Sequence, residues 1–182
     1  KLTFDNNIAK SKQTFIAQRW NLVPQNLKAY EQGKLSKPVK PICFYIDDAF
    51  PVEWKNAIKQ GVELWNKAFE QAGYQKAIEA LDFPKNDHNF DADDIAYSCI
   101  RYVPSTAEKV TSSFLANPQT GEIINASVFV PANVGDQIYR WLFLGSAASD
   151  ATMRTSHLPQ DKFNQGLKYM VACEIGRSLG LL

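Results

Sequence analysis

Residues 42–73 read ICFYIDDAFPVEWKNAIKQGVELWNKAFEQAG, and this stretch contains the two patterns that decide the fold. The apolar run Ile42–Ile46 is bounded by Pro41 and by two aspartates, which is typical of a central strand buried on both faces. A helix is predicted from Pro51 to Gly73, because proline is tolerated in a first turn and glycine suits a helix end. Apolar residues recur within it at steps of three or four and form one stripe: Trp54, Ile58, Val62, Trp65, Phe69 and Ala72.

The patterns on either side of this stretch predict the rest of the domain. Strands are expected at residues 77–81, 95–103, 111–116 and 123–130, and helices at about 135–148 and 161–179. The resulting order is one strand, one helix, four strands and two helices. It predicts a single α/β (α+β) domain with a mixed sheet, in which the first two strands run parallel.

Composition excludes several classes of protein. Of the 182 residues, 45% are hydrophobic and 21% are charged, and the net charge of +1 does not favour nucleic acid or an anionic membrane surface. No apolar run approaches the ~18 residues of a membrane-spanning helix. The three cysteines are too scattered for a disulfide framework. Because the chain starts at a lysine without a signal segment and ends just after an apolar helix, we expect it to be part of a longer protein.

The last predicted helix carries the pattern that points to chemistry. Residues 171–182 read VACEIGRSLGLL. Helical geometry places Cys173 and Arg177 about 200–240° around from Val171, close together, with Glu174 beside them. This spacing matches His-Glu-x-x-His, in which two imidazoles bind zinc and the glutamate polarises the bound water.

This stretch resembles the metzincin zinc motif, His-Glu-x-x-His-x-x-Gly-x-x-His, and most closely bacterial zinc-dependent peptidases that read His-Glu-x-Gly-His-Thr-Leu-Gly-Leu. Three further stretches are similar to that group: PVKPICFYID at 38–47, the apolar helix pattern from Trp54 to Gly73, and NPxTGEI at 117–123. The family usually has aspartate where Asn117 stands.

The resemblance implies a domain organisation and a location. Residues 38–182 would form a metzincin-like zincin domain that is truncated at its C-terminus, with a twisted mixed sheet and long helices including the zinc-type helix. Residues 1–37 would be an N-terminal extension. Family members use zinc, and the resemblance implies a secreted, periplasmic or cell-envelope protein of bacterial type.

The ligand positions of the motif are altered in this chain. Cys173 could offer a thiolate, whereas the guanidinium of Arg177 has no lone pair to donate to a metal. The third ligand would fall at residue 183, one past the last residue. We therefore expect no bound metal, Cys173 as a small buried residue, and Glu174 as a vestigial general-base position paired with Arg177 or Arg140.

Three functions remain open, so the sequence does not decide whether the chain is an enzyme. The first is a non-catalytic member of the metallopeptidase family. The second is a binding module for a peptide or protein along an edge strand at residues 111–116, with Phe114, Leu115 and Ala116 as the contact residues. The third is an active metallopeptidase, completed by residues beyond 182 or by another metal geometry around Cys173. The oligomeric state is not specified.

The remaining candidate residues are expected to be structural. His88 and His157 fall in predicted loops and are not expected to form a nucleophilic pair with a cysteine. The aspartates of residues 87–94 lack the regular alternation, the glycine and the distal glutamate of a calcium loop, so a solvated loop is predicted. Core positions are predicted for two cysteines and four tryptophans: Cys43, Cys99, Trp20, Trp54, Trp65 and Trp141.

Overall fold

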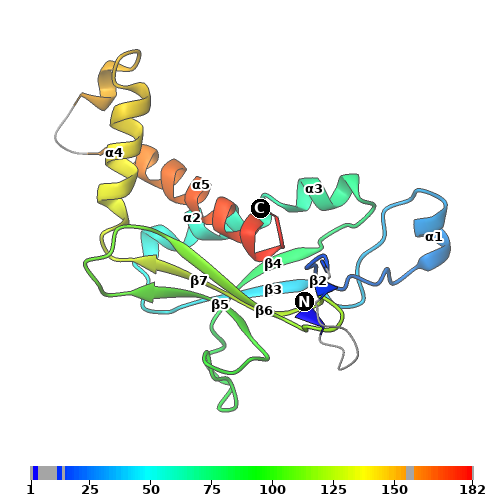
Figure 1. Cartoon of the computed structure of the whole chain (residues 1–182). Helices are drawn as coiled ribbons and strands as arrows, with labels where there is room; N and C mark the ends of the chain where they lie inside the picture. Colours follow the sequence, from blue (N-terminus) through cyan, green and yellow to red (C-terminus); the bar gives the residue numbers. More distant parts are fainter. Residues whose placement is uncertain (1, 4–11, 14, 155–157, 182) are drawn as a thin grey trace.

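A computed structural model of the chain describes residues 2–3, 12–13, 15–154 and 158–181. Its centre is a five-stranded sheet in the order β4-β3-β5-β7-β6 (Figure 1). The strands are β3 (Ile42–Ile46), β4 (Ile78–Asp82), β5 (Ser98–Val103), β6 (Thr111–Ala116) and β7 (Ile123–Pro131). β3, β4, β5 and β7 are parallel, and β6 is an antiparallel edge strand. The predictions of a mixed sheet and of a parallel first pair are confirmed.

The helices lie mainly on one side of this sheet, with α4 projecting away from it (Figure 1). They are α1 (Leu27–Glu31), α2 (Val52–Glu63), α3 (Asn66–Gln71), α4 (Val134–Ser146) and α5 (Gln160–Ser178), with a short 3-10 helix η1 (Ala151–Met153) after α4. A small ribbon pairs β1 (Leu2–Thr3) with β2 (Lys12–Gln13). Within the described residues, no helix combines the length and the apolar character needed to cross a membrane.

The prediction of one unbroken helix from Pro51 to Gly73 is wrong. The helix is interrupted at residues 64–65, so that α2 and α3 are separate. Two side chains at the break bond to other elements: the Trp65 indole donates to the Ala172 carbonyl at 2.8 Å, and the Asn66 amide exchanges hydrogen bonds with the backbone of Ile78. These tertiary bonds override the helical periodicity. Ala72, predicted on the buried stripe, is exposed.

The main core lies between the sheet and the pair α2 and α5. Ile58 and Val62 of α2 are fully buried there, as are three residues of the stripe predicted on α5: Leu167, Val171 and Ile175. The helix-facing residues of β3 join them, since its burial alternates along the strand. The prediction that β3 is buried on both faces is therefore correct for one face only, and Cys43 is half-buried rather than core.

The other face of β3 and β5 is partly covered by the loop between β4 and β5, residues 83–97. Tyr45 of β3 packs against Phe90 and Tyr97 of this loop, with ring centroids 5.3 and 5.5 Å away. Aromatic packing of this kind contributes about 0.5–1.5 kcal/mol per pair beyond the area it buries. The acidic part of the loop stays in solvent, because Asp91, Asp93 and Asp94 are all exposed.

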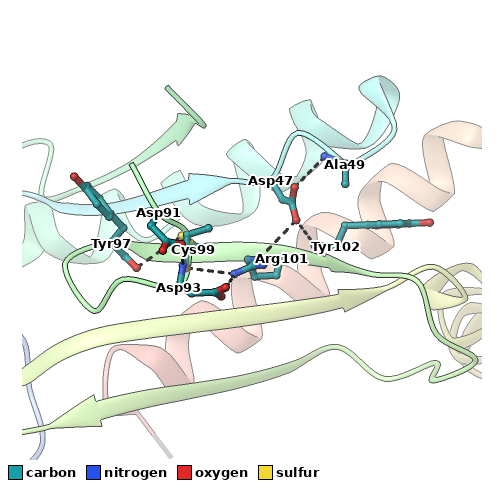
Figure 2. Close-up of polar contacts among 9 residues, drawn as sticks. Asp47, Ala49, Asp91, Asp93, Tyr97, Cys99, Arg101 and Tyr102 are labelled. Carbon is teal, nitrogen blue, oxygen red and sulfur yellow. Dashed lines mark hydrogen bonds and ion pairs between the residues drawn. The ribbon is translucent and has the colours of Figure 1, made fainter. Parts of the chain in front are cut away.

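An ion-pair network fixes this acidic loop to the end of β3. Figure 2 shows Arg101 lying between Asp47 and Asp93, with nitrogen–oxygen distances of 3.8 and 2.7 Å. The Asp47 carboxylate also accepts the backbone N–H groups of Ala49 and Tyr102. These contacts hold the loop against the sheet and have a structural role.

The close approach of α2 to α5 depends on Gly61. A β-carbon at this position would lie 2.7 Å from the carbonyl oxygen of Lys168 and 3.1 Å from the Val171 side chain. The obstructing atom is backbone, which cannot swing aside as a flexible side chain can. Any larger residue would push α2 away from α5, the helix that carries Glu174.

We predict opposite effects for two helical glycine substitutions. Gly61→Ala should lower the free energy of unfolding by about 1–3 kcal/mol, because overpacking outweighs the better helix propensity of alanine. Gly145→Ala in α4 should raise it by about 0.5–1 kcal/mol, since beyond the chain neighbours and the backbone of α4 itself no described atom lies within 4 Å of the added β-carbon. Urea denaturation of both variants measures this. Stabilisation by Gly61→Ala would show that the two helices are less closely packed than described.

Candidate functional site

The candidate site lies where α5 crosses beneath the edge strand β6. Glu174 of α5 is 7% exposed, and both of its carboxylate oxygens are engaged. The Ser112 hydroxyl of β6 donates to Oε2 at 2.7 Å, and Arg177 Nη1 donates to Oε1 at 2.6 Å. A buried carboxylate needs such partners, because burial without them costs several kcal/mol. The contact therefore joins the two elements that form the site.

Arg177 is the partner that Glu174 uses, which confirms one of the two pairings predicted from sequence. Its side chain is 58% exposed, so the pair lies at the surface on the arginine side. Arg140, the other predicted partner, forms two hydrogen bonds of 2.8 Å with Glu108 instead.

The prediction that Cys173 is a buried filler is wrong, because its side chain is exposed. Its position about 200° around the helix from the buried Val171 already places it on the far side. That geometric argument outweighs the general tendency of free cysteine to be buried. Cys99 is buried as predicted.

A pocket of about 240 Å³ lies beside this site, between α4, α5 and the segment that precedes β6. Its lining includes Lys109, Gln137 and Trp141, together with Tyr169, Cys173, Glu174 and Arg177. The Trp141 and Tyr169 rings stack with their centroids 5.0 Å apart and their planes 8° apart. Both rings are about half exposed, so the prediction that Trp141 belongs to the core is wrong. Trp20, Trp54 and Trp65 are partly buried against the core.

The cysteine thiols of this chain lie in two kinds of environment: Cys99 and Cys43 are buried or half-buried, and Cys173 is exposed. Burial raises the pKa of Cys99 to about 11 and also raises the pKa of Cys43. At the pocket, a hydrogen bond with Cys173 is the main cause that raises the pKa of the Tyr169 phenol. The exposed thiol of Cys173 and this phenol, one helical turn apart, form one edge of the pocket.

These residues do not fit a zinc ion. Arg177 stands where the motif that the sequence resembles has its second ligand, and it cannot coordinate a metal because its guanidinium is always protonated and has no free lone pair. Each oxygen of Glu174 already accepts one hydrogen bond, from Arg177 or from Ser112. His88 lies in the 83–97 loop, and His157 lies outside the described residues. In the described part of the chain, no group of three or more His, Cys, Asp or Glu side chains could hold a metal.

The predicted peptide-contact residues belong to an edge strand, as expected, but they do not share one surface. In the β6–β7 pair, Leu115 lies opposite Asn125 and is half exposed on the face away from the helices. Phe114 packs against the core, and Ala116 is half-buried next to a register shift. Strand alternation places neighbouring side chains on opposite faces.

Sequence reasoning missed Ser112. Strand alternation puts it on the same face as Phe114, which would have been enough to direct it toward the helices. Ser112 and Glu174 are 62 residues apart in the sequence, however, and no local pattern predicts their contact.

Comparisons with known proteins add nothing to this geometry: no protein-family model, no curated protein and no solved structure matches the chain.

We predict that Glu174 and Arg177 are energetically coupled. Arg177→Ala should lower the free energy of unfolding at pH 7 by about 1–2 kcal/mol, since the exposed arginine is partly screened while the carboxylate it leaves behind is buried. Adding Glu174→Gln should recover part of that loss. Thermal or urea denaturation of the double-mutant cycle gives the coupling.

The matched control for this cycle is Arg140→Ala. It breaks an ion pair in which both partners are more exposed, so we expect a loss below about 1 kcal/mol. Additive effects of the substitutions at positions 174 and 177 would contradict the account.

We also predict that one thiol reacts quickly in the folded protein. At pH 8 a disulfide reagent should label Cys173 first and Cys99 last, because the raised pKa of buried Cys99 keeps its thiol protonated. Cys173→Ser should remove the fast phase, and denaturant should make all remaining thiols react. A fast phase that survives Cys173→Ser would show that a different cysteine is accessible.

Proposed function

We propose that this chain is a catalytically degenerate, metzincin-like domain that binds an extended peptide along β6. The observation that carries the proposal is that Glu174 bonds both Arg177 and Ser112, beside an edge strand that pairs only with β7 among the described strands. The mixed sheet, its antiparallel edge strand and the α5 helix beneath it agree with the resemblance of the sequence to that family.

The state of Glu174 argues against peptide hydrolysis by the mechanism of the family. A general base must present a free oxygen within hydrogen-bond reach of the proton that it abstracts. Here Oε1 is bonded to Arg177 and Oε2 to Ser112, while the metal-ligand position next to it holds a cation. A water molecule at this place would meet a guanidinium where the family holds its metal, and a carboxylate that already accepts two hydrogen bonds.

The composition of β6 supports peptide binding. Edge strands are usually protected from pairing by charged residues or proline. The opposite edge follows this rule, since β4 reads IEALD with two acidic residues. β6 reads TSSFLA, six residues without a charge or a proline, and among the described strands only β7 pairs with it. Such an edge is suited to adding a peptide as a further strand.

A peptide selected from a random dodecapeptide phage library, then synthesised, tests this proposal. We predict that N-methylation of its backbone, one residue at a time, abolishes binding at every second position, because alternate N–H groups of an added strand face β6. Fluorescence polarisation measures each affinity. The unmodified positions serve as internal controls, since N-methylation leaves side chains unchanged.

Two results would contradict the proposal. One is a selection that enriches no peptide, or a methylation scan without the period of two. The other is cleavage of the bound peptide in the presence of added zinc, detected by mass spectrometry, if the substitution Glu174→Ala abolishes that cleavage. The second result would support the alternative of an active metallopeptidase.

A further inference from the structure

We infer that the peptide bound along β6 presents a carboxylate to Lys109 and Arg177 at the mouth of the pocket between α4 and α5. This inference rests on the proposed function and names the chemistry of its ligand. It is carried by the continuity of the pocket with β6, by the unbalanced charge of its lining, and by the stacked aromatic pair beside it.

The pocket begins where β6 begins. Lys109 and Val110 line it and directly precede Thr111, the first residue of the strand. An added strand that continues one or two residues beyond Thr111, at about 3.3 Å per residue, therefore reaches the pocket. Every second side chain of that strand points to the side of the sheet where Ser112 meets α5, which is the side of Arg177.

The charges of the lining leave an excess of positive charge. Its cations are Lys109 and Arg177, and its one carboxylate is Glu174, which is already bonded to Arg177 and Ser112. Within the described part of the chain, the exposed Lys109 has no ion-pair partner. Glu108, the nearest acidic residue in sequence, is held by two hydrogen bonds to Arg140.

Arg177 has hydrogen-bonding capacity to spare. Its guanidinium carries five N–H donors, of which the described contacts use one, and more than half of the side chain is exposed. Guanidinium groups bind carboxylates through paired hydrogen bonds. The bond to Glu174 holds this group in place and so reduces the entropy lost when a second carboxylate binds.

The aromatic pair gives the ligand an apolar neighbour. Trp141 and Tyr169 are stacked and about half exposed on the wall of the same pocket. Exposed rings of this size bury much apolar area at little entropic cost when a ligand packs on them. The ligand that fits is an acidic residue followed or preceded by an apolar one. Its carboxylate belongs either to an Asp or Glu side chain or to the peptide C-terminus.

A positional-scanning set of octapeptides tests the inference. Each pool is random except for one position fixed as Glu, Gln or Lys, and each is made with an amidated and with a free C-terminus. We expect one position at which Glu binds about tenfold tighter than Gln, with Lys weaker still, and a preference that shrinks at high salt. If the free C-terminus alone gives this gain, the α-carboxylate is the ligand.

Three variants locate the binding groups. Lys109→Gln should reduce the preference for Glu about threefold, and the double variant Arg177→Gln with Glu174→Gln should remove most of it without leaving a buried charge unpaired. Lys85→Gln, an exposed lysine in the 83–97 loop, is the matched control and should change nothing.

The outcomes separate this inference from the proposed function. Equal binding of the Glu and Gln pools by the wild-type protein overturns the inference and leaves peptide binding intact. A preference for Glu that survives both the Lys109 and the Arg177 variants also overturns it. Failure of every pool to bind overturns the proposed function itself.

Discussion

The buried carboxylate of Glu174 is the constraint on which the rest of the site depends. A charge that is 7% exposed must be surrounded by donors, and this chain supplies one from the edge strand and one from the same helix. Because Ser112 is one of these donors, the demand for partners fixes α5 against β6. Because Arg177 is the other, the place next to the carboxylate is already occupied by a cation.

Tryptophan side chains from other parts of the chain fix the C-terminal half of α5. The indoles of Trp20 and Trp65 donate to the carbonyls of Ser178 and Ala172 at 2.9 and 2.8 Å, near the end of the helix. Gly176 lets the Trp65 ring lie against the helix, since a β-carbon there would be 2.5 Å from the ring. A rigid helix keeps Cys173, Glu174 and Arg177 in fixed positions relative to β6, which a binding site requires.

Local sequence patterns predicted most of the helices and strands. The features that these patterns missed depend on contacts between residues far apart in the sequence. The strand at residues 111–116 and the helix at 161–179 were predicted within one residue, because alternation and helical spacing are properties of the local sequence. The break after α2 was missed because it depends on the bond from Trp65 to a helix more than 100 residues away. For the site, helical spacing offered Arg177 as one of two partners of Glu174. Strand alternation could place Ser112 on the helix-facing side, but nothing local predicts its contact with Glu174.

The central proposal is that Arg177, paired with Glu174, takes the place of the metal centre found in the family that the sequence resembles. Titration of the reduced, folded protein with Co²⁺ tests it most directly, because a thiolate bound to cobalt gives a charge-transfer absorption band and cobalt occupies zinc sites. The account predicts no saturable band from Cys173, since the neighbouring ligand position holds a guanidinium. A band that saturates at one cobalt per chain and disappears in Cys173→Ser would contradict it.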